Sequence, residues 1–378
     1  MSPGTLHEFH RRLGASFAEL GGQEVVADYG DWRAEHAALR QTAGVLDLSF
    51  RSRLCLVGND RVRFLHGQVT NDVNRLRPGQ GCYAALTTHK GKMESDLNLF
   101  VLSEEILLDF EPGLAEKISA RLEKFIVADD VRVVNVAPHY GLLSVQGPRA
   151  AEVVIALGLM ARDALPHAPA EQPGGLAIVH IADATLGEIY LASHARLSGW
   201  GGRPGEPTGF DLFVPNHSLS AVADRLIAAA RTVGGRACGW TALETARIEA
   251  GIPRFGADMD ETTFPQECGI EARAVSYRKG CYIGQEILNR LHTFGHVNRQ
   301  LCGLRLADSL KALPARGDKL FFGGQEIGQV TSAAASPVFG NIALGCVRRH
   351  VSRAGRELIL HTASGESPAR IAGLPFTS

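Results

Sequence analysis

The sequence predicts an α+β protein with mostly antiparallel sheets flanked by helices, followed by a small C-terminal β-barrel. The first reason lies in how its strand-like segments follow one another. Segments 82–87, 96–102 and 106–110 are rich in apolar residues and are separated by short turns, one of them around Gly91. Tight turns connect antiparallel strands, whereas parallel strands need long crossovers. The sequence therefore favours antiparallel sheets over a doubly wound parallel sheet.

Two further observations support this fold: a short repeat, and a change in the sequence pattern near residue 300. The strand-like segment 54–57 ends in Gly58 before a helical pattern, and segment 142–146 ends in Gly147 before another one. This repeat implies two related α+β halves. From about residue 300 onward, short strands alternate with Gly turns, which is typical of a small β-barrel or jelly roll.

The chain length predicts more than one domain, because 378 residues are too many for one ordinary hydrophobic core. We expect an N-terminal α+β part over 1–140, a second α+β part over 141–299, and the barrel over 300–378. Hydrophobic residues make up 45% of the chain and charged residues 21%, which is the profile of a soluble globular protein.

Charge and cysteine content indicate a cytoplasmic protein. Lys and Arg number 39 against 40 Asp and Glu, so no global charge drives binding to nucleic acid or to an anionic membrane. The 7 cysteines are scattered and contain no CxxC pair, which favours reduced thiols. Residues 1–20 lack the apolar core of a secretory signal, and no segment is apolar for long enough to span a bilayer. We expect no membrane partner, and nucleic acid is not the expected main ligand.

The densest chemical signal is segment 278–286, in which two cations and two glycines surround Cys281. Residues 285–290 have a helical pattern, which places Cys281 near a helix N-terminus. There the helix dipole and the neighbouring Lys279 favour the thiolate. The alternative is a buried structural cysteine in a tight turn, because most free cysteines are inert. The residues alone support both interpretations about equally.

A local basic strip follows this motif. Its cations are Arg290, His292, His296 and Arg299, together with Arg278 and Lys279. The strip suits an anionic cofactor tail, a phosphate or RNA, and it is equally typical of a solvated linker into the barrel. The two histidines have i,i+4 spacing without a third metal ligand, so we expect no metal site. Three cysteines are too irregularly spaced for a stable iron–sulfur cluster: Cys268, Cys281 and Cys302.

Two carboxylates and one ion pair complete the candidates. Asp96 begins an apolar strand, and Asp211 follows the Gly- and Pro-rich loop 198–209. A carboxylate accepts two N–H bonds side by side, although each of these is also explained as an ordinary turn acid. Glu244 and Arg247 share a helix face at i,i+3. They form either a surface ion pair of little energetic value or an arginine presented to a ligand.

Six motifs are spread over the chain: YGD at 29–31, EHAALR at 35–40, GVLDLS at 44–49, TNDV at 70–73, RIEAG at 247–251 and DMDET at 258–262. Together they resemble the glycine-cleavage T-protein, an aminomethyltransferase, over nearly the whole chain. The octapeptide KGCYIGQE at 279–286 is similar instead to the signature of the YgfZ branch of the same superfamily. The classical T-protein lacks the cysteine of this octapeptide.

The resemblance implies a cloverleaf of three domains around a central site for tetrahydrofolate or a derivative. It implies ligand contacts for Tyr83, Asp96, Asp211 and Arg247, and it makes Asp96 the catalytic acid that helps to activate the folate amine. Cys281 and Lys279 are the other catalytic candidates. The resemblance is imperfect: Ser95 precedes Asp96 where the family has a second Asp, Asp211 replaces a Glu, and segment 200–206 replaces a Tyr-Thr-Gly-Glu loop. These departures leave folate binding intact and weigh against aminomethyl transfer, which needs accurate placement of its reacting groups.

Three functions follow as hypotheses. The leading one is a folate-binding accessory protein for iron–sulfur cluster assembly or repair, linked to tRNA modification, with Cys281 as a redox-active or transient ligand thiol. Its partners are folate and iron–sulfur proteins or their assembly machinery. The runner-up is a folate-dependent aminomethyltransferase of the glycine cleavage system, or a related demethylase. The third is an RNA-contacting protein that uses the basic strip, against which the near-neutral total charge argues. The residues do not decide whether the chain is an enzyme.

Overall fold

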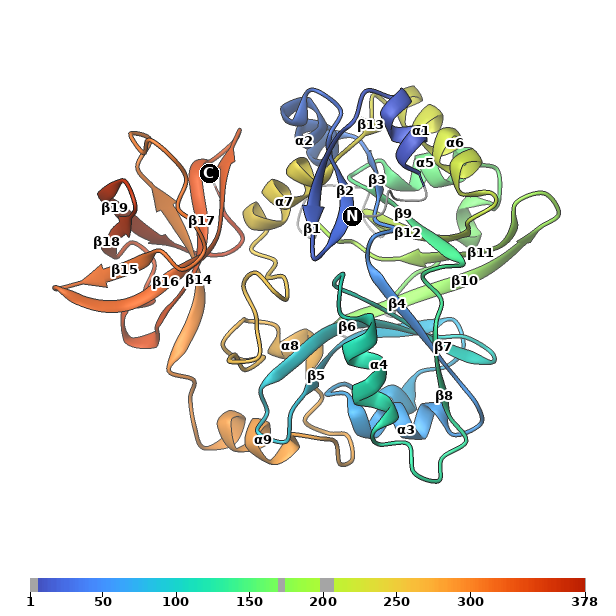
Figure 1. Ribbon diagram of the computed structural model, residues 1–378, viewed down its shortest axis with the longest axis horizontal. Helices are drawn as coiled ribbons and strands as arrows, with labels where there is room; N and C mark the ends of the chain where they lie inside the picture. The colour runs from blue at the N-terminus through green and yellow to red at the C-terminus, as the bar shows by residue number, and fades with distance from the viewer. Residues whose placement is uncertain (1–5, 169–173, 198–206, 378) are drawn as a thin grey trace.

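The computed structural model describes residues 6–168, 174–197 and 207–377. In this part of the chain, a long twisted sheet with flanking helices forms the larger body, and a closed barrel lies beside it (Figure 1). Neighbouring strands are antiparallel throughout, apart from one short parallel pair, β3 and β13. The predicted α+β fold with antiparallel sheets and a C-terminal barrel is confirmed. The domain boundaries at 140 and 300 stay predictions.

The described residues form an 11-stranded sheet that runs through both predicted α+β halves. In the order of their pairing, its strands are β13 (Arg236–Ala237), β3 (Gly44–Asp47), β9 (Tyr140–Gln146), β12 (Gly209–Pro215), β11 (Gly187–Ser193), β10 (Gly175–Asp183), β5 (Gln80–Thr87), β6 (Met93–Val101), β7 (Glu105–Phe110), β4 (Ser52–Val57) and β8 (Arg132–Asn135). A separate hairpin is formed by β1 (Ser16–Leu20) and β2 (Gln23–Asp28).

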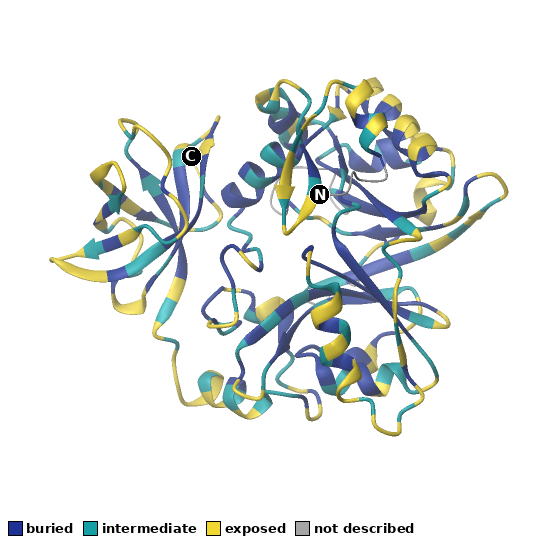
Figure 2. Ribbon diagram, in the orientation of Figure 1, coloured by how far each residue is buried: buried dark blue, intermediate teal, exposed yellow. Residues whose placement is uncertain are grey.

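Helices cover the sheet and connect it to the barrel. They are α1 (His7–Arg12), α2 (Trp32–Gln41), α3 (Arg61–Gln68), α4 (Ala115–Glu123), α5 (Ala150–Ala156), α6 (Leu219–Thr232), α7 (Trp240–Glu249), α8 (Glu271–Ala274) and α9 (Gln285–Thr293). Short 3-10 turns are η1 (Val73–Arg75), η2 (Arg162–Ala164) and η3 (Arg349–Val351). Figure 2 shows that α4 and α6 are exposed on their outer sides, as expected for amphipathic helices with one apolar face.

The repeated strand–Gly–helix unit is present in both halves of the sheet. Gly58 follows β4 and Gly147 follows β9, and both have positive φ angles, of 108° and 125°. A Cβ atom at Gly58 would lie 2.1 Å from the carbonyl oxygen of Asp130, and one at Gly147 would lie 2.6 Å from that of Thr42. Only glycine fits such a turn without a backbone shift. The two glycines therefore direct the chain from the sheet into α3 and α5.

Each half has its own apolar core, and a third core joins them. Helices α3 and α4 cover one core, and α5 and α6 cover another. Phe100 in β6 and Phe213 in β12 lie in the joining core, with ring centroids 5.9 Å apart at an angle of 69°. This edge-to-face contact between fully buried rings fixes the two halves relative to each other.

The C-terminal barrel has six strands in the described part of the chain. In the order of their pairing they are β14 (Arg299–Leu306), β17 (Gly340–Arg348), β16 (Gln325–Ser336), β15 (Lys319–Phe322), β18 (Glu357–Thr362) and β19 (Gly365–Ala372). Closure removes the free edges that an open sheet would leave. Helix α7 is the main connection to the barrel. Its Ile248 packs with Ala334, Ile342 and Leu344, so α7 contacts the large sheet and the barrel at once.

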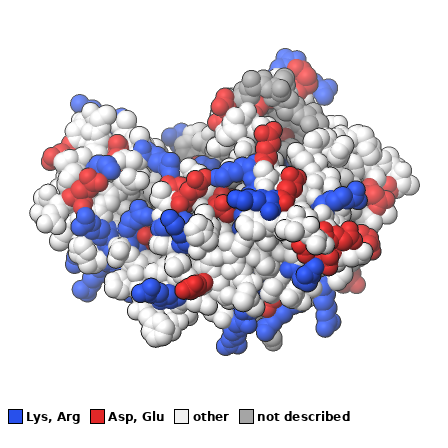
Figure 3. Space-filling view, turned by 60° about the horizontal axis from the view of Figure 1, so that its bottom comes forward, with Lys and Arg blue, Asp and Glu red and all other residues white. Residues whose placement is uncertain are grey.

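Side chains of both charges lie on the face of the molecule that Figure 3 shows. On the face in Figure 3, basic and acidic side chains are intermixed on both the barrel side and the sheet side. No helix among the described residues is long and apolar enough to cross a membrane.

Candidate functional site

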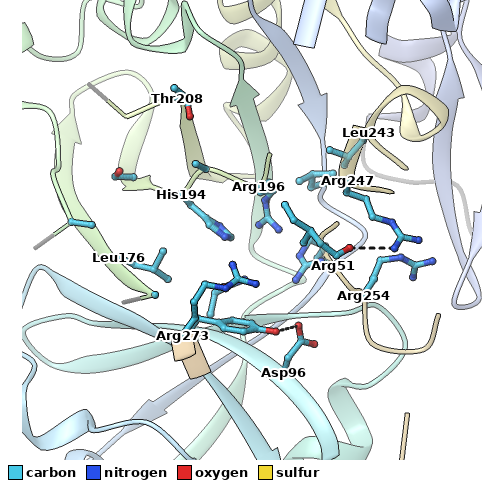
Figure 4. A pocket seen from close by; sticks show the side chains of 18 of the residues that line it. Arg51, Asp96, Leu176, His194, Arg196, Thr208, Leu243, Arg247, Arg254 and Arg273 are labelled. Carbon is cyan, nitrogen blue, oxygen red and sulfur yellow. Dashed lines mark hydrogen bonds between the residues drawn. The ribbon is translucent and has the colours of Figure 1, made fainter. Parts of the chain in front are cut away.

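A cavity of about 490 Å³ lies where the two halves of the sheet meet α7 and segment 252–254 (Figure 4). Its volume is in the range of small-molecule sites. The charged and aromatic residues that line it are Arg51, Tyr83, Asp96, Glu111, His167, His194, Arg196, Trp240, Glu244, Arg247, Arg254 and Arg273. Its apolar residues include Leu48, Leu176 and Leu243.

Tyr83 and Asp96 form a hydrogen-bonded pair on the cavity wall. Strand β5 pairs with β6 so that Tyr83 lies opposite Asn98 and diagonal to Asp96, which brings the two side chains to one face of the sheet. Tyr83 Oη donates to Asp96 Oδ2 at 2.9 Å (Figure 4). The other carboxyl oxygen, Asp96 Oδ1, is buried and has no hydrogen-bond partner among the described residues. Asp96 lines the cavity, so the protein leaves one acceptor of a cavity-lining carboxyl group unpaired.

Burial and a neighbouring carboxylate change the acidity of Asp96. Loss of solvent, with a smaller contribution from the nearby Glu111, raises the pKa of Asp96 to about 6. The hydrogen bond from Tyr83 opposes this shift because it stabilises the ionised form. Burial raises the pKa of Tyr83 well above 10, so its hydroxyl remains a donor at neutral pH. Asp96 thus titrates close to the range in which a general acid or base is effective.

Arg196 is held in the opposite wall by two buried carboxylates. Its Nη2 atom donates to Asp211 Oδ2 at 2.7 Å and to Asp109 Oδ2 at 3.0 Å, and its Nε atom donates to both oxygens of Asp211 at 3.1 Å. His194 Nδ1 lies 2.8 Å from Asp211 Oδ2. Burial raises the pKa of Asp211, but the positive charges of Arg196 and then His194 lower it by more. The net result is a pKa of about 2 for Asp211. This network fixes the positions of Arg196 and His194.

An alternating chain of charges forms a third part of the wall. Glu111 accepts from Arg51 Nη1 at 2.6 Å and from Arg254 Nη1 at 3.1 Å. Glu244 in turn lies 3.5 Å from Arg254 Nε and accepts a hydrogen bond from Arg247. Each carboxylate therefore lies between two guanidinium groups, and such pairing is what makes buried charge tolerable.

Arg247 connects this wall to the barrel. Its guanidinium donates to Glu244, to Asp258 and, at 2.6 Å, to Ser332 Oγ in β16. Asp258 also accepts from Thr331 Oγ1 at 2.5 Å. Glu244 and Arg247 form the ion pair that their i,i+3 spacing predicts, and that pair lines the cavity instead of the surface.

Tyr83, Asp96 and Arg247 line the same cavity, whereas Asp211 does not. Asp211 is fully buried beside Arg196 and His194, and both side chains bind its carboxylate. Asp211 as a direct cofactor ligand stays a prediction; in the structure its carboxylate positions two residues that line the cavity, Arg196 and His194.

Lys279 and Cys281 lie outside the cavity lining. Lys279 Nζ points inward and donates to the carbonyl oxygens of His66, Val69 at 2.7 Å and Asn71 at 2.9 Å. Burial lowers the pKa of Lys279 to about 8. Cys281 is exposed to solvent. Three backbone carbonyls bind the ammonium group of Lys279, which indicates a structural role, and the catalytic roles of Lys279 and Cys281 stay predictions.

The helical start near Cys281 is present at α9, whose N-cap is Gly284 with a φ of 89°. His292, one of the predicted basic strip, lies 2.9 Å from Glu271 through its Nδ1 atom. Part of the Gly- and Pro-rich loop, residues 198–206, lies outside the described residues, as does its Trp200–Glu206 departure from the family pattern.

Sequence reasoning missed most of the charged wall: Arg51, Glu111, His194, Arg196, Arg254 and Arg273. None of them falls in a motif with recognisable spacing. The one available signal was position, since His194 and Arg196 directly precede the Gly- and Pro-rich loop.

Comparison with known proteins identifies the family to which this architecture belongs. The pattern of the GCVT N-terminal domain matches residues 6–279, and that of the glycine cleavage T-protein C-terminal barrel domain matches residues 299–377. The chain belongs to the glycine cleavage T-protein family. The T-protein relatives include the aminomethyltransferases of Halalkalibacterium halodurans, 29% identical over 98% of this chain and 96% of that protein, and of Rubrobacter xylanophilus, 30% identical over 98% and 93%.

A solved T-protein has the same overall structure. The glycine cleavage system aminomethyltransferase T from Bartonella henselae superposes with a TM-score of 0.82 at 25% identity, covering 100% of this chain and 98% of that one. The predicted superfamily is therefore confirmed, while its YgfZ branch is not.

T-proteins of this family use tetrahydrofolate, as the sequence predicted for this chain. The residues present fit such a group. Asp96 offers a buried carboxyl oxygen without a partner on the wall of a cavity of suitable volume, and it can accept N–H bonds from an amine-rich ring.

Proposed function

We propose that this protein binds tetrahydrofolate in the cavity beside Asp96 and catalyses folate-dependent transfer of an aminomethyl one-carbon unit in the cytoplasm. The observation that carries the proposal is the Tyr83–Asp96 pair, in which one buried carboxyl oxygen remains free on the cavity wall. The family membership and the aminomethyltransferase relatives support it.

Asp96 has the central role in this proposal. Tetrahydrofolate supplies the amine nitrogens that accept the one-carbon unit. Asp96 would accept an N–H hydrogen bond from the bound cofactor and, when ionised, would take up a proton that the amine loses as its nitrogen bonds to the one-carbon unit. The carbon–sulfur and carbon–nitrogen bonds of the aminomethyl group break in the reaction, so the carrier leaves as its free thiol and the amino group as ammonia. The hydrogen bond from Tyr83 orients the carboxyl group and favours its ionised form. A base whose pKa is about 6 is ionised at neutral pH and can still return its proton.

The remaining wall gives the site a fixed shape. Arg196 is held by Asp109 and Asp211, and Arg254 is held by Glu111 and Glu244. Side chains already fixed by such networks do not reorganise when the ligand binds, which favours accurate orientation of reacting groups. Arg247 as a direct cofactor ligand stays a proposal, and its buried Nε atom has no hydrogen-bond partner among the described residues.

Two measurements test the proposal. Calorimetric titration with tetrahydrofolate should show binding to the purified protein, and mixing with an aminomethyl-lipoyl carrier should then yield methylene-tetrahydrofolate. Absence of binding contradicts the whole proposal. Binding without turnover contradicts transferase activity and leaves a folate-binding protein.

A second candidate function rests on Cys281. It is the exposed thiol among the described cysteines, and it lies in the octapeptide that resembles the YgfZ signature. In this alternative, folate is bound but not consumed, and Cys281 acts as a redox-active or transient ligand thiol in iron–sulfur cluster assembly or repair, with a link to tRNA modification. Iron–sulfur enzyme activity in a null strain separates the two: Cys281→Ser fails to restore it under this alternative and restores it fully under aminomethyl transfer.

A further inference from the structure

The guanidinium groups on the cavity wall differ in whether a carboxylate neutralises them. Four arginines of the wall each contact at least one carboxylate: Arg51, Arg196, Arg247 and Arg254. Their partners are five acids: Asp109, Glu111, Asp211, Glu244 and Asp258. This part of the wall therefore has no surplus positive charge, and with Asp96 ionised it disfavours an incoming anion.

Arg273 is the exception. It lies in α8, it is exposed, and no carboxylate contacts its side chain in the part of the chain that the structure describes. Its guanidinium carbon is 5.3 Å from the centre of the Tyr83 ring, the ring whose hydroxyl binds Asp96. Figure 4 shows the Arg273 side chain pointing into the cavity, on the side away from Asp96.

The backbone of Arg273 is held tightly, so its side chain starts from a fixed point. Asn71 Nδ2 donates to the Arg273 carbonyl oxygen at 3.0 Å. Gly174 lies just before β10 with a φ of 71°, and a Cβ atom there would lie 2.6 Å from the same carbonyl oxygen. Asn71 and Gly174 thus hold the backbone of an arginine whose side chain has no acidic partner among the described residues.

We propose that Arg273 is the subsite for the anionic glutamyl tail of the folate cofactor, an inference that rests on the proposed function. The tail carries carboxylates, and a guanidinium binds a carboxylate through two parallel N–H bonds. Tyr83 lies between Asp96, which accepts N–H bonds, and Arg273, which donates them. The cavity therefore sets the direction of an elongated ligand, with its amine-rich ring toward Asp96 and its carboxylates toward Arg273.

A comparison of two ligands tests this subsite. Calorimetry on the full-length protein should use tetrahydrofolate and the simple amide of tetrahydropteroate, which lacks the glutamate and carries no carboxylate. Arg273→Met should weaken tetrahydrofolate binding about 10- to 100-fold, as expected for loss of a charged hydrogen-bonded pair, and leave binding of the tetrahydropteroyl amide unchanged. Arg278→Met is the matched control, because Arg278 is exposed outside the cavity lining, and it should bind both ligands like the wild type.

The outcomes distinguish the subsite from the proposed function. If wild type binds tetrahydrofolate and Arg273→Met binds it equally well, the subsite is refuted while folate binding stands. Equal weakening of both ligands by Arg273→Met also refutes it, because the arginine would then act on the ring or on the fold. If wild type binds neither ligand, the proposed function fails and the subsite with it.

Discussion

Tyr83 Oη donates to Asp96 Oδ2 at 2.9 Å, and the second oxygen of that buried carboxyl has no partner among the described residues. One oxygen is thus fixed by the protein, the other is unpaired, and Asp96 itself lines a cavity large enough for a small molecule. This geometry makes the acidity of Asp96 the property that controls the site.

The first prediction concerns the pH dependence of transfer. Because Asp96 has a pKa of about 6, kcat/KM should fall as the pH decreases through about 6. Tyr83→Phe removes the hydrogen bond that favours the carboxylate, so the pKa of Asp96 rises and the acidic limb of the pH–rate profile moves to higher pH. Stopped-flow assays from pH 5 to 8, which extend about one pH unit below this pKa and about two above it, measure that limb.

Tyr282→Phe is the control for this experiment. It also removes a buried hydroxyl, but one that lies outside the cavity lining. The acidic limb of the Tyr282→Phe pH–rate profile should match that of the wild type. A Tyr83→Phe profile that coincides with the wild type, or moves to lower pH, contradicts the assigned role of Asp96.

The second prediction concerns Asp211, which holds Arg196 and His194. Asp211→Asn leaves the buried guanidinium of Arg196 with one carboxylate, so the free energy of unfolding at neutral pH should fall by about 3 kcal/mol. The pKa of Asp211 is lowered to about 2, so wild type has this stabilisation above about pH 4 and loses it as the pH falls toward 2. Urea unfolding across this range measures both effects.

Glu357→Gln provides a matched control, because Glu357 pairs with Arg370 at the exposed surface. Its effect should stay below about 1 kcal/mol. An Asp211→Asn variant with wild-type stability and weakened tetrahydrofolate binding would identify Asp211 as a direct ligand.

The third prediction separates a structural Lys279 from a catalytic one. Lys279→Met removes the donor shared by three backbone carbonyls, so it should lower the free energy of unfolding by about 3 kcal/mol. Lys124→Met, at an exposed position, should have little effect. Turnover per folded molecule should remain near the wild-type value. Normal stability with lost turnover would show that Lys279 takes part in catalysis.

The fourth prediction concerns thiol reactivity. Cys281 is exposed, whereas burial raises the pKa of Cys82 and Cys302 to about 12 and that of Cys346 to about 11. Brief treatment with iodoacetamide at neutral pH, followed by peptide mass spectrometry, should therefore modify Cys281 first. Cys281→Ser should abolish the fast phase and Cys346→Ser should not. Fast labelling of another cysteine contradicts the exposure on which the second candidate function depends.

The sequence predicted the features that depend on short separations. Tyr83 and Asp96 are 13 residues apart on strands joined by one turn, and their segments were expected as neighbouring antiparallel strands. The glycines of the repeat were likewise found at the predicted turns, at Gly58 and Gly147. The barrel was predicted from the alternation of short strands and Gly turns after about residue 300, and the structure has a closed barrel there.

Contacts between distant segments could not be predicted in the same way. Arg196 meets Asp109 across 87 residues, and Lys279 meets carbonyls more than 200 residues away. Lys279 was expected to favour the Cys281 thiolate because the two are only two residues apart in sequence. Contacts with α3 and with segment 69–71 turn the Lys279 ammonium inward, while the thiol stays exposed. Asp211 was expected beside the ligand, and in the structure it binds Arg196, which lines the cavity, across 15 residues.

The most direct test of the account is single-turnover formation of methylene-tetrahydrofolate by wild type and Asp96→Asn, with an aminomethyl-lipoyl carrier as donor. Asp96→Asn keeps the shape of the side chain and removes its charge. The folded-state pKa of Asp96 is raised, so ionising this carboxyl costs stability at neutral pH, and the variant should be at least as stable as wild type. We predict that wild type turns over and that Asp96→Asn still binds tetrahydrofolate but reacts about 100- to 10,000-fold more slowly. Equal rates for the two proteins, or no product from either, would contradict the proposed role of Asp96 in aminomethyl transfer.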